Sequence, residues 1–119
     1  MLLLCRMFQT EASLVNSLLP KSVTTAIAVS ISESAGGLPG LTAASVCVTG
    51  IEGAMLAPLF AKLFHVTDPV AEGVAIGACS HAVGTSKALE IGPLQGAMSS
   101  IALCVCGIIT SILAMFFTA

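Results

Sequence analysis

Two polar patches interrupt an otherwise apolar chain, and they contain most of the residues that could bind a solute. The first patch covers residues 20–25 (PKSVTT) and the second covers residues 80–90 (SHAVGTSKALE). Inside a bilayer, unpaired backbone groups are tolerated only where protein covers them or water reaches them, so a repeated interruption indicates an internal cavity. Two such breaks are typical of a transport site.

The second patch predicts a binding site for an anion around Lys87. Together with the hydroxyls of Thr85 and Ser86, this lysine would receive an anionic group at the N-terminus of a half-helix, where the helix dipole is positive and backbone amides are free. The alternative is structural, because Lys87 and Glu90 are three residues apart and would form an ion pair on one helical face.

The first patch predicts a second end that favours an anion. Pro20 suits the opening turn of a half-helix, and polar donors follow it beside free backbone amides. These donors are Lys21, Ser22, Thr24 and Thr25. In the alternative interpretation, the hydroxyls only hydrogen-bond the backbone around a proline break.

The remaining ionisable residues suggest proton coupling or ion pairing. His81 could bind substrate or relay protons, or it could be a structural donor in a polar break. Glu33 and Glu90 could pair or couple to protons, and Glu33 could instead lie solvated at the membrane interface. Glu52 falls in the middle of an apolar segment, where it must be protonated, paired with a lysine or placed beside water, because a charge near the bilayer centre costs about 2.5–3.5 kcal/mol.

Composition places these patches in a membrane protein. Of the 119 residues, 56% are hydrophobic and 8% are charged, with a mean hydropathy of +1.05, whereas soluble domains carry about 25% charged residues. The net charge of −2 and the absence of a basic run argue against nucleic acid as a partner. Neither a nucleophile elbow, a phosphate-binding glycine loop nor a metal-ligand cluster occurs, so we expect no enzyme, no metal and no cofactor.

Cysteines and the N-terminus carry weaker expectations. The five cysteines are odd in number and form no C-x-x-C pair, so we expect packing residues rather than zinc ligands or disulfides. Residues 1–6 lack a basic region before the apolar stretch, so no cleaved signal peptide is expected. Lys62 and His65 favour a cytoplasmic side for the linker at residues 65–69.

Segment lengths predict an all-α membrane protein with two full spans. Residues 41–64 are long enough to cross a bilayer, and a second span begins at Ala97 within the uncharged run of residues 92–119. Gly36 to Gly40 is expected to form a turn, because it contains a glycine pair and a Pro-Gly pair.

Two further segments are predicted to be discontinuous helices. Residues 11–19 end at Pro20, and residues 21–34 would form the second half of that helix. Residues 70–83 are too short to span, so we expect them to be half of a helix that breaks at Gly84 and continues at residues 87–91.

An offset of 57 residues superposes the two halves of the chain and predicts an internal repeat. The coinciding pairs are Glu33/Glu90, Cys47/Cys104, Val48/Val105, Gly50/Gly107, Ile51/Ile108, Ala57/Ala114 and Phe60/Phe117. The repeat units would be residues 13–64 and 70–119 of a single transmembrane region. Transporters are often built from such repeats. Chance matches also occur, because few residue types make up the apolar segments.

Three stretches closely resemble the signatures of the LrgB/CidB family, the larger membrane subunits of antiholin-like systems. They are residues 18–25 (LLPKSVTT), 32–37 (SESAGG) and 80–90 (SHAVGTSKALE). The resemblance implies a polytopic protein of the bacterial inner membrane that works with a smaller LrgA/CidA-like protein and controls lysis and murein hydrolases. It also implies transport of small carboxylates such as pyruvate, since a plastid relative carries glycolate and glycerate.

The chain departs from this family in length and at several positions. It matches only the C-terminal half of family members, so it could be a truncated, non-functional fragment. Where the family usually has proline, glycine and arginine, this chain has Ala26, Ala82 and Lys87, and Glu52 replaces an apolar residue. A second alternative is a non-transporting regulatory subunit that packs against a holin-like partner. The chain could also form a homo-oligomer.

Overall fold

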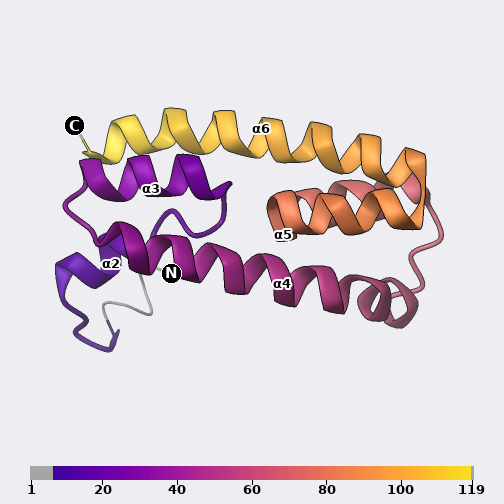
Figure 1. Ribbon diagram of the computed structural model, residues 1–119, viewed down its shortest axis with the longest axis horizontal. Coiled ribbons are helices and arrows are strands. Elements are labelled where there is room, and N and C mark those ends of the chain that lie inside the picture. The colour runs from indigo at the N-terminus through magenta and orange to yellow at the C-terminus, as the bar shows by residue number, and fades with distance from the viewer. Residues whose placement is uncertain (1–6, 119) are drawn as a thin grey trace.

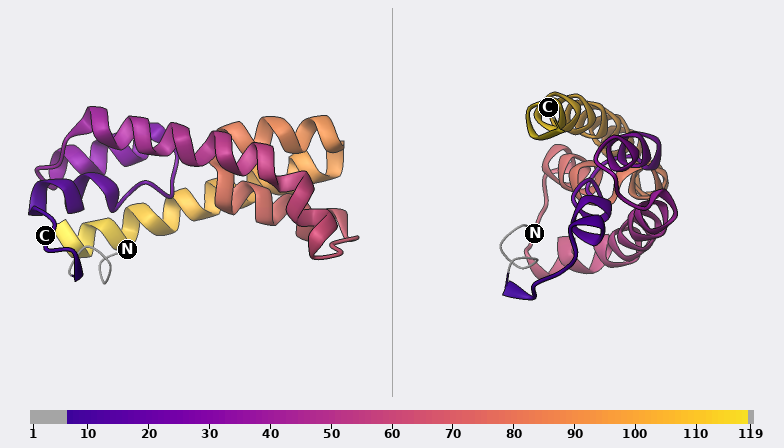
Figure 2. Two further views of the ribbon diagram at one scale, coloured as in Figure 1. Left: turned by 90° about the horizontal axis from the view of Figure 1, so that it is seen from below. Right: turned by 90° about the vertical axis from the view of Figure 1, so that its left-hand side faces the viewer.

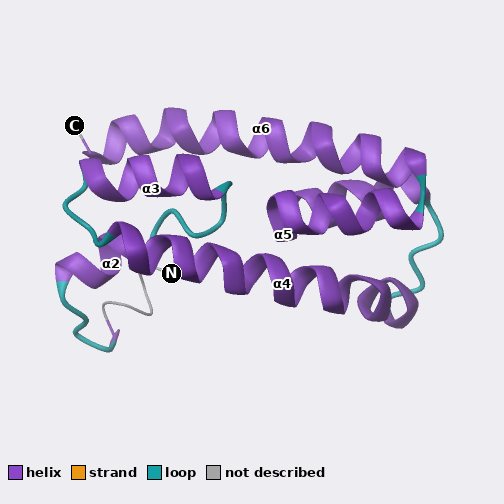
Figure 3. Ribbon diagram, in the orientation of Figure 1, coloured by secondary structure: helices purple, strands orange, loops and turns teal. Residues whose placement is uncertain are grey.

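The computed structural model describes residues 7–118, and this part of the chain contains helices and no strand, which confirms the all-α prediction (Figure 3). Its helices are α2 (Ala12–Leu18), α3 (Thr25–Ser34), α4 (Pro39–Leu63), α5 (Pro69–Ile91) and α6 (Pro93–Thr118). The N-terminal residues 1–6, and with them Cys5, lie outside the described residues.

Helices α4 and α6 are the two in the described chain that are long and apolar enough to cross a membrane. They run in opposite directions along the long axis of the molecule (Figure 1), which measures 41 Å and is close to the roughly 40–45 Å thickness of a whole bilayer. Both helices begin at a proline, whose fixed φ suits the first helical turn. The expected turn at Pro39 and the expected start at Ala97 are therefore wrong.

Helix α5 is interrupted at His81, whose backbone is non-helical with φ 51° and ψ −141°. The chain doubles back at this residue, so that residues 69–80 and 82–91 form two arms of a hairpin beside α6 (Figures 1 and 2). The predicted break at Gly84 is wrong. Gly84 is helical and buried, and it lies against Ser80 and Ile76, where a side chain would not fit.

Helices α2 and α3 approach the middle of the molecule in a similar way. Residues 19–24 leave α2, extend toward the centre and return as α3 (Figure 1). The predicted half-helix at 21–34 begins only at Thr25, so Pro20 precedes that helix instead of opening it. Thr24, with φ −57° and ψ 146°, is the non-helical residue that flanks the N-terminus of α3.

The offset of 57 residues also relates these helix boundaries. Shifted by 57, the bounds of α3 become residues 82–91, which is the second arm of α5. The following spans, α4 and α6, point in opposite directions (Figure 1). The internal repeat stays a prediction. If the two halves are repeats, α3 should correspond to the second arm of α5, as these bounds do.

Small residues, rather than large apolar ones, bring the helices together. The buried apolar cluster contains only Val23, Ala28 and Val46, with Ile27 packed against it. Helix α5 packs closely on α6, where a Cβ atom at Gly77 would collide with the backbone of Ser99. Close approach of small residues is the usual basis of helix packing in membranes.

Hydrogen bonds of buried hydroxyl groups connect each hairpin to its neighbouring span. The hydroxyl of Thr42 in α4 donates to the Ser17 carbonyl at 2.8 Å and contacts the Ser32 hydroxyl at 2.8 Å. In the second half of the chain, Thr85 and Ser99 share a hydrogen bond of 2.9 Å between α5 and α6. Thr42 and Ser99 are separated by the same 57 residues.

We predict that Gly77→Ala lowers the free energy of unfolding by about 1–3 kcal/mol, because the new methyl group overpacks the α5–α6 contact. The matched control is Gly40→Ala in α4, where a Cβ meets nothing within 4 Å. Reversible unfolding in mixed micelles, followed by circular dichroism, compares the two variants. Equal stability of the variants would contradict the packing described above.

Candidate functional site

The two hairpin tips meet between α4 and α6 (Figure 1). Lys21 of the first tip lies beside His81 of the second. The His81 imidazole lies beside the backbone of Lys21 and close enough to experience the charge of its ammonium group. His81 is only 4% exposed, whereas Lys21 is half-buried. A cation and an imidazole from distant parts of the sequence therefore share one interior position.

His81 combines two unfavourable features that the surrounding structure maintains. Its positive φ with ψ −141° is a backbone conformation that favours glycine, and such residues are commonly strained by about 1–3 kcal/mol. Its Nε2 atom is buried and has no hydrogen-bond partner among the described residues. Buried polar atoms are usually satisfied by protein, water or a ligand, so this nitrogen is a candidate position for a bound water or ligand.

Glycines in the middle of α4 make room for the α5 tip. A Cβ at Gly53 would collide with Ser80, and one at Gly50 would lie 3.3 Å from Val83. Neither glycine was expected at the site. The available signal was the pair of glycines around Glu52 in the centre of the span.

The second arms of both hairpins begin at this junction. Thr24 makes no side-chain cap to α3, so the first backbone amides of that helix remain available near Lys21. The second arm of α5 starts directly after His81. Free amides and the positive helix end favour an anion, although the first arms end nearby and their carbonyls offset part of this field.

Most predicted residues of the second patch lie away from the junction. Thr85 and Ser86 donate to backbone carbonyls within α5, at 2.9 and 3.2 Å, and Thr85 also contacts the Ser99 hydroxyl of α6. Lys87 pairs with Glu90 at 2.8 Å, and their side chains are 40% and 68% exposed. The expectation that Lys87 follows a helix break is wrong, because the break lies six residues earlier.

The other candidates are distributed along the hairpin and the span. Ser22 and Thr25 are exposed beside the first tip, and Thr24 is half-buried there. Glu33, in the last turn of α3, and Glu52, in the middle of α4, are both exposed. Neither carboxylate forms an ion pair with a described lysine.

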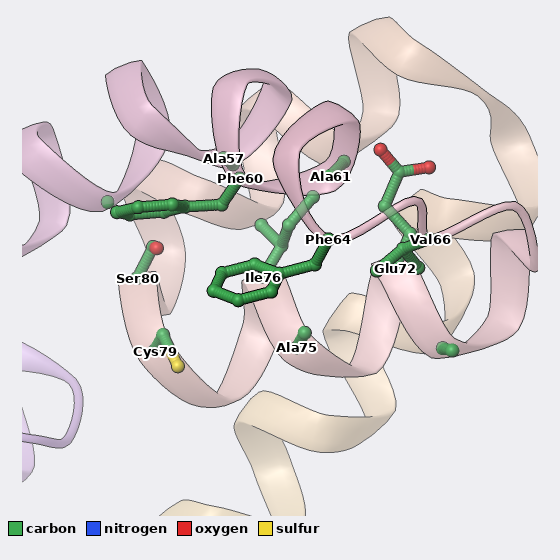
Figure 4. Close-up of a pocket in the computed structure, with 12 residues that line it drawn as sticks. Ala57, Phe60, Ala61, Phe64, Val66, Glu72, Ala75, Ile76, Cys79 and Ser80 are labelled. Atoms are coloured by element: carbon green, nitrogen blue, oxygen red, sulfur yellow. The ribbon is translucent and has the colours of Figure 1, made fainter.

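A groove of about 370 Å³ runs between α4 and the first arm of α5 (Figure 4). Glu72 lies at one end and Ser80 at the other, and the rings of Phe60 and Phe64 line the space between them. A second groove, of about 490 Å³, is lined by Thr24, Ile27 and α6. Each groove therefore reaches one of the two hairpin tips.

The acidic, histidine and cysteine side chains of the described residues are dispersed, and the cysteines are free. None of these residues form a group of three or more histidine, cysteine or acidic side chains that could hold a metal. Cys47, Cys79 and Cys104 are exposed, which contradicts the expected packing role, and Cys106 is partly buried.

Two substitutions at His81 distinguish the stability effect of its backbone strain from the effect of losing the imidazole ring. Both His81→Gly and His81→Ala remove the ring, but only glycine relieves the positive φ, so the Gly variant should be more stable than the Ala variant by about 1–3 kcal/mol. Unfolding in mixed micelles measures the difference. An Ala variant at least as stable as the Gly variant would contradict backbone strain at His81.

Comparison with known proteins places the chain in a family. The LrgB-like family model matches residues 1–119. The chain is 40% identical to the uncharacterized protein YxaC of Bacillus subtilis (strain 168), over 92% of this chain and 48% of that protein. It is also 40% identical to the antiholin-like protein LrgB of Bacillus mycoides (strain KBAB4) and of Bacillus cereus (strain B4264), over 90% of this chain and 46% of each relative.

The chain thus spans about half the length of the curated relatives it matches. No solved structure matches it. The family match extends over every residue and includes the two polar patches that build the junction. This chain belongs to the LrgB-like family.

Proposed function

We propose that this chain takes part in moving small carboxylates, of the pyruvate and glycolate class, across the bacterial inner membrane through the junction of the two hairpin tips. The observation that carries the proposal is the meeting of Lys21 and His81, with a buried and unpartnered Nε2 atom at the same place. A carboxylate there would balance the charge of the lysine and accept a hydrogen bond from Nε2 of the protonated imidazole.

The surroundings of the junction fit a small anion. The free amides at the start of α3 are further donors, and both second arms direct their positive ends to the site. Solute sites are generally apolar clefts with a few converging polar groups, and the two grooves that reach the tips have this character. We place the substrate contacts at Lys21 and His81 rather than at Lys87.

A second candidate function is regulatory. The curated relatives are called antiholin-like, and the resemblance implies control of lysis and murein hydrolases together with a small LrgA/CidA-like membrane protein. The broad exposed apolar faces of α4 and α6 favour this candidate, because they could pack against such a partner. A regulatory subunit needs these faces and does not need the lysine and histidine at the tips.

Uptake of a labelled small carboxylate into proteoliposomes distinguishes the two functions. We predict that Lys21→Met and His81→Gln each lower uptake by about tenfold or more, because each removes a donor or a charge from the anion. Lys62→Met, which removes an exposed lysine at the end of α4, is the matched control and should retain uptake.

The assay should use this chain and full-length YxaC with the equivalent substitutions, because the chain covers only part of that protein. The double variant Lys87→Met, Glu90→Gln removes the local ion pair and should also retain uptake. Uptake lost only in this double variant would move the site to the second arm. Unchanged uptake in both tip variants would favour the regulatory function, and no uptake by any form of this chain would favour a non-functional fragment.

A further inference from the structure

Two consecutive buried residues, Ser80 and His81, carry polar atoms that have no partner among the described residues. Ser80 is only 2% exposed, yet its hydroxyl forms no hydrogen bond within this part of the chain. The next residue carries the unpartnered Nε2 atom. The other buried hydroxyl groups of the described residues are all hydrogen-bonded, namely those of Ser17, Ser32, Thr42, Thr85 and Ser99. Buried polar groups without a partner are rare, and here two of them are neighbours.

Packing around Ser80 requires a small side chain but not a hydroxyl group. A Cβ atom at Gly53 or at Gly84 would collide with the Ser80 side chain, so these two glycines leave room for a residue of this size. Alanine would fill the same space without burying a hydroxyl that lacks a partner, which is unfavourable for stability. The hydroxyl of Ser80 is therefore suited to a partner that the described residues do not supply.

The position of Ser80 connects the junction of the hairpin tips to a groove. Ser80 lines the inner end of the groove of about 370 Å³ between α4 and the first arm of α5. Figure 4 shows its oxygen directed toward α4 and the ring of Phe60, and apolar side chains such as Ile76 line the space beyond. Consecutive Cα atoms are about 3.8 Å apart, so a ligand of only a few atoms can contact both Ser80 and His81.

We propose that Ser80 is a specificity-determining residue, whose hydroxyl donates a hydrogen bond to an oxygen atom on C2 of the substrate. This inference rests on the proposed function, in which the carboxylate lies between Lys21 and the protonated imidazole of His81. The rest of the substrate then extends past Ser80 toward the apolar groove. An oxo or hydroxyl group on C2 accepts the hydrogen bond from Ser80, and C3 contacts the apolar lining. A carboxylate without an oxygen on C2 leaves the Ser80 hydroxyl unpaired, and the site selects against it.

The native thiol of Cys79 provides a measurement of binding that does not require transport. Cys79 is exposed, precedes Ser80 and lines the same groove. In a variant that retains only this cysteine, a ligand at the junction should slow alkylation of the thiol in mixed micelles. We expect pyruvate and lactate to protect Cys79 at about tenfold lower concentration than propionate, which has the same chain length but no oxygen on C2. A variant that retains only Cys47, which is exposed on α4 and lines none of the grooves described above, is the matched control and should show no protection.

The variant Ser80→Ala tests the hydroxyl itself. We expect protection by pyruvate to weaken about tenfold while protection by propionate is unchanged, so that the preference for pyruvate disappears. Ser99→Ala is the matched control, because it removes a buried hydroxyl that bonds Thr85 between α5 and α6, and it should keep the preference. Circular dichroism verifies that both variants are helical.

Three results would overturn the role of Ser80. Equal protection by pyruvate and propionate in the chain with Ser80 would do so while leaving the proposed carboxylate site in place, and this comparison also decides the matter if Ser80→Ala does not fold. Equal weakening of both acids in Ser80→Ala would assign its hydroxyl to the carboxylate or to packing. No protection of Cys79 by either acid would contradict the carboxylate site itself, and the role of Ser80 with it.

Discussion

His81 and Lys21 lie together in the middle of the molecule, where the tips of the two hairpins meet. Each hairpin interrupts helical backbone at a depth where lipid can offer no hydrogen bonds, so the exposed polar groups have to be covered by protein or water. The structure covers one tip with the other and holds both between α4 and α6. The same convergence brings a lysine and a buried imidazole together, and we propose this position as the site for a small anion.

Close packing by small residues makes this convergence possible. The α5 tip reaches the centre only because α4 has Gly53 where any side chain would collide with Ser80. Hydroxyl pairs such as Thr85 with Ser99 satisfy buried polar atoms between an arm and its span. Because the neighbouring elements are held so closely, they can maintain His81 in a backbone conformation that an isolated hairpin would abandon.

Features set by local composition could be predicted from the sequence. Hydropathy located both spans, and the two polar patches indicated where the helices are interrupted. The exact position of the second break was predicted wrongly at Gly84. Gly84 is needed for close packing inside a helix, whereas His81 adopts the positive φ at the tip. The paired interruptions indicated that the two patches would meet, but they placed the substrate contact at Lys87. The pairing of His81 with Lys21, 60 positions apart, could not be singled out from local patterns.

Cross-linking between the two tips tests the central claim, that they meet inside the membrane, most directly. In a cysteine-free chain, Ser22→Cys and Ala82→Cys place thiols on neighbours of Lys21 and His81, both at exposed positions. A short thiol-specific cross-linker should join them within one chain in intact membranes. It should not join Ser22→Cys to Glu90→Cys, which lies about 12 Å further along the second arm. Equal cross-linking of the two pairs, or none at residues 22 and 82, would contradict a junction built from the two tips.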